Sequence, residues 1–134
     1  MAKRIPGLSD EWTDLLTCIF LHMLLPLLPI VFEAVISRGP PSDGTLAITA
    51  ALYAMAIGLS SENKAMFGLC VLIGVSFSAV YGIISGPNNE QITGVGFSST
   101  VSIGLVFLIH ICERYNRHVA DCRPFLSFAN GGAR

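Results

Sequence analysis

Four residues in the first long apolar segment have types and a spacing suited to chemistry inside a membrane. His22, Pro26, Pro29 and Glu33 fall within a sector of roughly 60° on a helix that turns about 100° per residue. Histidine titrates near physiological pH, so such a polar stripe would line a pore or act as a protonation switch. Each proline also frees the carbonyl four residues earlier from its backbone hydrogen bond. We therefore expect this face to point at protein or at water, because lipid offers no hydrogen-bond partner.

Simpler interpretations of the ionisable residues stay open. Glu33 lies near the end of the segment, where a carboxylate costs little and can pair with Arg38. His22 lies nearer the middle of the segment. Its simpler interpretation is a neutral imidazole that is hydrogen-bonded to a carbonyl and has no role beyond packing. His110 and Glu113 are three residues apart, so they are expected to form a pair on one helix face. A cluster of hydroxyls in the fourth apolar segment either bonds back to its own helix or lines a hydrated face: Ser98, Ser99, Thr100 and Ser102.

The surrounding sequence is suited to a lipid environment. Of the 134 residues, 52% are hydrophobic and 13% are charged, against roughly a quarter charged in an ordinary soluble domain. The apolar residues gather into four blocks, at or near the length of about 20 residues that a helix needs to cross the hydrocarbon core. These blocks span residues 13–37, 42–60, 64–85 and 94–112. The sequence predicts an all-α, polytopic membrane protein: a four-transmembrane-helix antiparallel bundle over residues 1–112 and a short cytoplasmic tail over residues 113–134.

The orientation follows from the positions of lysine and arginine. Only Arg38 lies in the connections on one side, whereas seven such residues lie on the other. These are Lys3, Arg4, Lys64, Arg114, Arg117, Arg123 and Arg134. By the positive-inside rule, both termini face the cytoplasm of a bacterial inner membrane, and Trp12 and Tyr115 lie at the cytoplasmic interface.

Small residues recur every four positions in the second, third and fourth predicted helices. They are Ala50, Ala54 and Gly58; Gly74, Ser78 and Gly82; and Gly96, Thr100 and Gly104. Such spacing lets helix backbones approach closely. Because one small bundle does not easily satisfy three of these faces internally, the pattern favours a homo-oligomer.

The residue patterns of several function classes are missing from the sequence. There is no Ser-His-Asp arrangement, HExxH motif, glycine-rich phosphate loop or CxxC pair, so we expect no enzyme, no metal site and no cofactor. A net charge of -1 gives no field that would attract nucleic acid. The four cysteines have no metal-type spacing and are expected to pack as small reduced side chains: Cys18, Cys70, Cys112 and Cys122.

The tail carries the residues predicted to contact a soluble partner. Its start continues the fourth helix into water, and Pro124 should end that helix. The aromatic residues beyond it suit either the membrane surface or a docking protein. The predicted partner contacts are Arg114, Arg117, Arg123, Phe125 and Phe128.

These features lead to two functional hypotheses. The first is a non-enzymatic membrane subunit, surrounded by lipid, that homo-oligomerises and serves as sensor or anchor for a soluble cytoplasmic protein. The second is a small ion channel or proton-coupled transporter whose path follows the polar face of the first helix. In length, helix number and lack of catalytic residues, the chain is similar to small four-helix membrane subunits of bacterial anti-phage systems, such as those of Kiwa and Rex. That architectural resemblance implies a role in antiviral defence.

Overall fold

The computed structural model describes residue 7, residues 9–87 and residues 92–123, and every regular element in these ranges is helical. Four helical segments are long and apolar enough to cross a membrane: Asp10–Ser37, Asp43–Ser60, Lys64–Ile84 and Val95–Ala120. The predicted all-α class is confirmed, and the four predicted blocks coincide closely with these segments. The fourth helix continues beyond the predicted end of the apolar block. The fold is therefore that of a multi-pass membrane protein.

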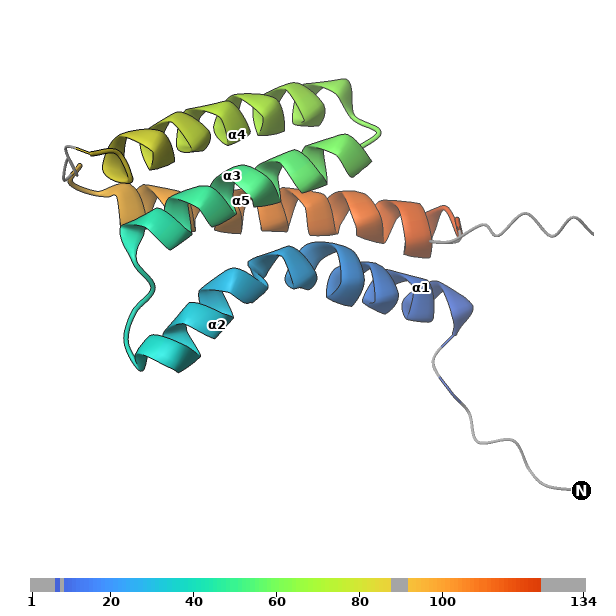
Figure 1. The fold of residues 1–134 in the computed structure, drawn as a ribbon. Coiled ribbons are helices and arrows are strands. Elements are labelled where there is room, and N and C mark those ends of the chain that lie inside the picture. Colours follow the sequence, from blue (N-terminus) through green and yellow to red (C-terminus); the bar gives the residue numbers. More distant parts are fainter. Residues whose placement is uncertain (1–6, 8, 88–91, 124–134) are drawn as a thin grey trace, which may run out of the picture.

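The first spanning segment is not one regular helix. It begins as α1 (Asp10–Cys18), widens into the π-helical η1 (Ile19–Leu24), tightens into the 3-10 turn η2 (Leu25–Leu27) and resumes as α2 (Leu28–Ser37). Pro26 lies in this irregular stretch and Pro29 in the first turn of α2, where a missing N–H is tolerated. Figure 1 shows the result as an arched segment whose α2 part diverges from its neighbours. Proline thus accounts for the bend.

Local capping sets the starts of the next two helices. The Ser42 hydroxyl accepts a hydrogen bond from Thr45 N at 3.3 Å at the start of α3 (Asp43–Ser60). Asn63 accepts one from Ala65 N at 2.9 Å at the start of α4 (Lys64–Ile84). Polar side chains at this position satisfy backbone donors that have no partner within the helix. Because α3 ends at Ser60 and α4 begins at Lys64, the short turn between them makes the two helices antiparallel neighbours.

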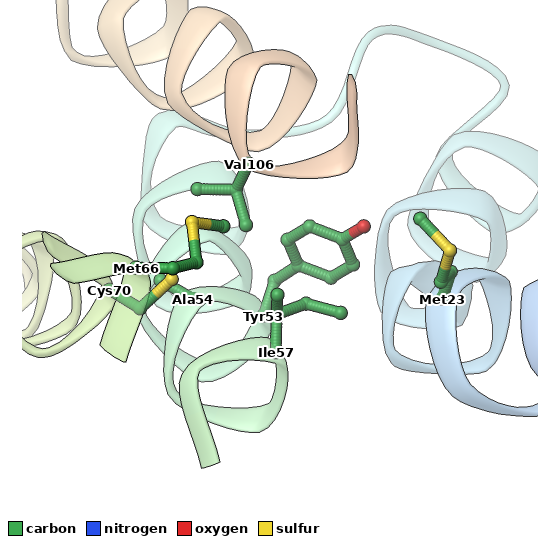
Figure 2. Close-up of a cluster of buried hydrophobic side chains, with 7 residues drawn as sticks. All are labelled: Met23, Tyr53, Ala54, Ile57, Met66, Cys70 and Val106. Carbon is green, nitrogen blue, oxygen red and sulfur yellow. The ribbon is translucent and has the colours of Figure 1, made fainter. Parts of the chain in front are cut away.

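Helix α3 is the centre of the bundle. It packs against α4, against α5 (Val95–Tyr115) and against the first spanning segment, whereas α4 packs mainly on α3 (Figure 1). Most apolar side chains of α4 and α5 point outward, as expected for helices that contact lipid. A core cluster fills the interior: Met23, Tyr53, Ala54, Ile57, Met66, Cys70 and Val106 (Figure 2).

The small residues are divided between the interior and the surface. Ala50, Ala54 and Gly58 are all buried, and a Cβ on Gly58 would lie 2.7 Å from the Cβ of Cys70. Gly74 is buried under Met55. A Cβ on Gly96 would lie 2.6 Å from Asp43 Oδ1. The remaining predicted packing residues face outward: Ser78, Gly82, Thr100 and Gly104.

Both ends of the described chain lie at the same end of the bundle. The Trp12 and Tyr115 rings meet edge to face, with their centroids 6.2 Å apart. The α3–α4 turn lies at this end as well (Figure 1). We call it the terminal end, and it is where the polar side chains gather.

Candidate functional site

Six polar residues at the terminal end form one hydrogen-bonded group, which we call the terminal network. Its members come from the first, second and fourth spanning segments and from the α3–α4 turn. They are His22, Ser60, Ser61, His110, Glu113 and Arg114. Such a group inside a membrane protein is costly unless its members satisfy one another.

His110 lies between an acid and a base on the same helix. It is fully buried, and its Nε2 accepts a hydrogen bond from Arg114 Nε at 2.9 Å. The His110 Nδ1 is 3.1 Å from Glu113 Oε2. Because arginine is only a donor, Nε2 must carry the lone pair, and the single ring proton lies on Nδ1 and is donated to Glu113. The contacts therefore specify a neutral His110 between two charged groups.

Glu113 also fastens α5 to the α3–α4 turn. Its carboxylate accepts from the Ser61 hydroxyl at 2.9 Å to Oε1 and 3.1 Å to Oε2, and from the backbone Glu62 N at 3.1 Å. Ser61 Oγ in turn accepts from Asn63 N at 3.1 Å. Hydrogen bonds to an ionised acceptor are stronger than neutral ones. The carboxylate therefore holds a backbone donor of a turn more than 50 residues away in the sequence.

Arg114 makes the second connection between these elements. It is only 5% exposed, and its guanidinium donates to the Ser60 carbonyl at 2.7 Å as well as to His110. A carbonyl at the end of a helix has no partner within that helix, so the guanidinium satisfies it. The buried charge is thus stabilised by two oriented acceptors, the His110 ring and the Ser60 carbonyl.

His22 brings the first spanning segment into the network. Its Nε2 is 2.6 Å from Ser60 Oγ, and the Ser60 hydroxyl also donates to the Ile57 carbonyl at 2.9 Å. With its only proton used on Ile57, Ser60 Oγ accepts from His22 Nε2–H. The His22 and His110 rings lie 5.9 Å apart between centroids. Two imidazoles from different helices therefore face each other.

An outer layer of ion pairs covers the network. Glu62 contacts Arg117 at 3.1 Å and Arg123 at 3.5 Å, and all three side chains are partly exposed. The Arg123 carbonyl is 2.7 Å from His118 Nδ1 in the short π-helical η3 (Asn116–Ala120). Exposed ion pairs of this kind stabilise a fold by about 0–1 kcal/mol each. Their main effect is to keep the end of α5 beside the α3–α4 turn.

The predicted polar face of the first helix is divided between the two ends of the bundle. His22 joins the terminal network, whereas Glu33 lies at the opposite end near Ser42 and Thr45, and its Oε2 is buried without a hydrogen-bond partner among the described residues. Pro26 is partly buried and Pro29 is exposed. The structure therefore does not bring His22 and Glu33 together.

The predicted partner contacts also differ in position. Arg117 and Arg123 lie in the exposed outer layer, whereas Arg114 is buried in the terminal network. Phe125 and Phe128 lie outside the described residues. The sequence interpretation assigned Arg114 to the tail and missed Ser60 and Ser61. The signal for Arg114 was its position four residues after His110, which places both on one helix face.

Three further hydroxyls are buried deeper in the bundle. Thr49, Tyr53 and Ser99 are at most 1% exposed, and their oxygens have no hydrogen-bond partner within the described residues. The Tyr53 hydroxyl points toward the irregular part of the first segment near Met23 (Figure 2). Buried polar atoms without a partner are uncommon and often mark hydration. These hydroxyls are polar positions in an otherwise apolar interior.

The arrangement can hold and redistribute a proton. His110 connects Glu113 to Arg114, and His22 lies across from it on another helix. In the part of the chain that the structure describes, no three His, Cys, Asp or Glu side chains are grouped to hold a metal ion. The contacts of His110 with Glu113 and Arg114 support acid–base behaviour.

Comparisons with known proteins do not add to this assignment. The chain matches no protein-family model, no curated protein and no solved structure.

Proposed function

We propose that the chain is a non-enzymatic membrane subunit that homo-oligomerises and acts as sensor or anchor for a soluble cytoplasmic protein. The observation that carries the proposal is the terminal network, which connects three spanning segments to the exposed layer of Glu62, Arg117 and Arg123. A change in helix packing would pass through Glu113 and Arg114 to that exposed layer. The layer is therefore suited to report the state of the membrane bundle to a bound partner.

The proposed orientation has both termini in the cytoplasm of a bacterial inner membrane. The excess of lysine and arginine on one side supports it, and Trp12 lies beside Tyr115 as an interfacial aromatic pair would. Thiol labelling of intact cells with a membrane-impermeant reagent tests this directly. Cys122, which is exposed, should react only after the cells are opened. Labelling of Cys122 in intact cells would reverse the assignment.

The partner-binding proposal is tested by changing the exposed layer. An Arg117→Ala, Arg123→Ala double variant should lose a soluble protein that co-purifies with the wild-type chain. Deletion of the residues after Val119 should have the same effect while membrane insertion is retained. Arg38→Asn is the matched control, because Arg38 is an exposed arginine in left-handed backbone at the opposite end and asparagine tolerates that conformation. Unchanged co-purification with both altered chains would contradict the proposal.

The biological setting that we propose is antiviral defence, on the strength of the architectural resemblance alone. Plaque counts on bacteria that carry or lack the intact gene test this proposal. Equal counts across a broad set of phages would remove the support for it.

A small ion channel or proton-coupled transporter is the second candidate. It is favoured by the irregular stretch Ile19–Leu27 of the first segment and by the Tyr53 hydroxyl that points toward it. Irregular membrane helices often expose carbonyls to ions or water. Ion flux into liposomes should then fall in a His22→Ala, Glu33→Gln double variant and in Tyr53→Phe. Equal flux in both variants would exclude this path.

A further inference from the structure

The hydrogen bonds of His110 depend on its protonation state. Arg114 Nε donates to His110 Nε2 at 2.9 Å, and arginine keeps its charge at every physiological pH. The observed contact therefore exists only while Nε2 is unprotonated. At the same time Nδ1 is committed to Glu113 at 3.1 Å.

Adding a proton to His110 would place two donors and two positive charges against each other. The ring Nε2–H would face Arg114 Nε–H across the distance that now holds a hydrogen bond. Because neither group can act as acceptor, one of them must move. The imidazole remains attached to Glu113, now as an ion pair, so Arg114 is the group that leaves.

The groups around His110 offer few other partners for Arg114 or for a protonated His110. From α5 itself Glu113 and Arg114 face the ring, and from η1 the His22 ring lies 5.9 Å away. The Cys18 thiol of α1 lies near Arg114 and Arg117, and the Cys70 thiol of α4 lies near Glu113. Glu113 is the only carboxylate among these neighbours, so a single negative charge would have to serve both protonated His110 and Arg114.

Release of Arg114 would also affect contacts other than its hydrogen bond to the His110 ring. The same guanidinium donates to the Ser60 carbonyl at 2.7 Å, so its departure also opens the contact between α5 and the end of α3. Tyr115 follows directly in the sequence and contacts Trp12. The contact between α5 and the first segment therefore depends on the position of Arg114.

We propose that His110 is a proton-dependent latch: uptake of one proton releases Arg114 from His110 and Ser60 and loosens the end of α5 from α3 and from the first spanning segment. The latch belongs to the single chain and does not require a bound partner or an open pore. It therefore goes beyond the proposed function and can be tested separately from it.

Trp12 is the only tryptophan of the chain and lies against Tyr115, so its fluorescence reports the state of the latch. The full chain in lipid nanodiscs is titrated from about pH 8 down to about pH 3, a range that extends well below ordinary histidine titration. We expect one reversible transition in Trp12 emission with the steepness of a single proton. His110→Gln should abolish it, because glutamine can accept from Arg114 and donate to Glu113 but cannot take up the proton. His118→Gln is the matched control and should keep it, because His118 lies outside the terminal network and contacts the Arg123 carbonyl.

Two outcomes would overturn the latch. One is a wild-type chain without a transition, and the other is a transition that persists in His110→Gln. A second measurement does not depend on how the variants fold. Nitrogen NMR of histidine-labelled wild-type chain should show His110 at neutral pH with its proton on Nδ1 and none on Nε2. A protonated Nε2 at neutral pH would also overturn the proposal.

Discussion

The sharpest test of the terminal network is Glu113→Gln, which changes the side chain's charge and donor pattern but hardly its size. Glu113 now accepts at both oxygens: from Ser61 and Glu62 N at Oε1, and from Ser61 and His110 Nδ1 at Oε2. Glutamine has one acceptor oxygen and one NH2 donor. Whichever way the amide is turned, its NH2 faces either Glu62 N–H or His110 Nδ1–H. The substitution therefore forces a contact between two donors.

The size of the effect follows from these contacts. One buried donor without a partner costs about 1–3 kcal/mol, and replacing the remaining charged hydrogen bonds by neutral ones costs about 1 kcal/mol more. The Glu113 side chain is 24% exposed, so water relieves part of this cost. The two costs together are about 2–4 kcal/mol. Because the side chain is partly exposed, we expect the free energy of unfolding to fall by an amount at the lower end of this range, about 2 kcal/mol.

The assay is equilibrium unfolding in mixed detergent micelles, followed by circular dichroism. Glu62→Gln is the matched control, because it removes the same charge in the next layer, where the side chain is 59% exposed. Loss of its two surface ion pairs should cost less than about 1 kcal/mol. If both variants unfold at the same detergent fraction, the terminal network does not hold α5 to the α3–α4 turn and the reasoning is refuted.

Three further predictions concern packing. Gly58→Ala should lower stability by about 1–3 kcal/mol, because the new Cβ would lie 2.7 Å from the Cβ of Cys70; a midpoint of detergent unfolding like that of wild type would contradict this close contact. Gly82→Leu and Gly104→Leu should leave the monomer folded, since a Cβ at either position would have no packing neighbour within 4 Å among the described residues, but should reduce the oligomer seen by light scattering in detergent. An unchanged oligomer mass would place the interface elsewhere. Tyr53→Phe should leave the unfolding free energy unchanged or raise it by up to about 1 kcal/mol, because its buried hydroxyl has no hydrogen-bond partner in the described part of the chain; a clear loss of stability would mean that the hydroxyl is hydrogen-bonded to water.

The spans could be predicted from the sequence because their causes are local. Apolar length marks each crossing, and Ser42 and Asn63 cap the helices that follow them. The pairing of His110 with Glu113 was predictable for the same reason, since three residues separate them on one helix.

The rest of the site depends on tertiary packing. His22 meets Ser60, 38 residues away, only because the first segment packs against α3. The prediction of one polar face assumed a straight helix with a constant angle per residue. The π-helical and 3-10 stretches over Ile19–Leu27 change both the rotation and the direction of the chain, and Glu33 follows α2 toward Ser42. Sequence spacing cannot predict a face across such a break.

The composition of the terminal network sets an order for its assembly in the membrane. His22 enters with the first span and Ser60 with the second, but His110, Glu113 and Arg114 belong to the last. A chain that is still being synthesised can already pair His22 with Ser60, but the Ser60 carbonyl and the Glu62 N–H have no partner until α5 arrives. Closure of the network marks the assembled four-helix bundle, and a chain truncated before α5 would present these unsatisfied polar groups to the proteases that remove unfinished membrane proteins.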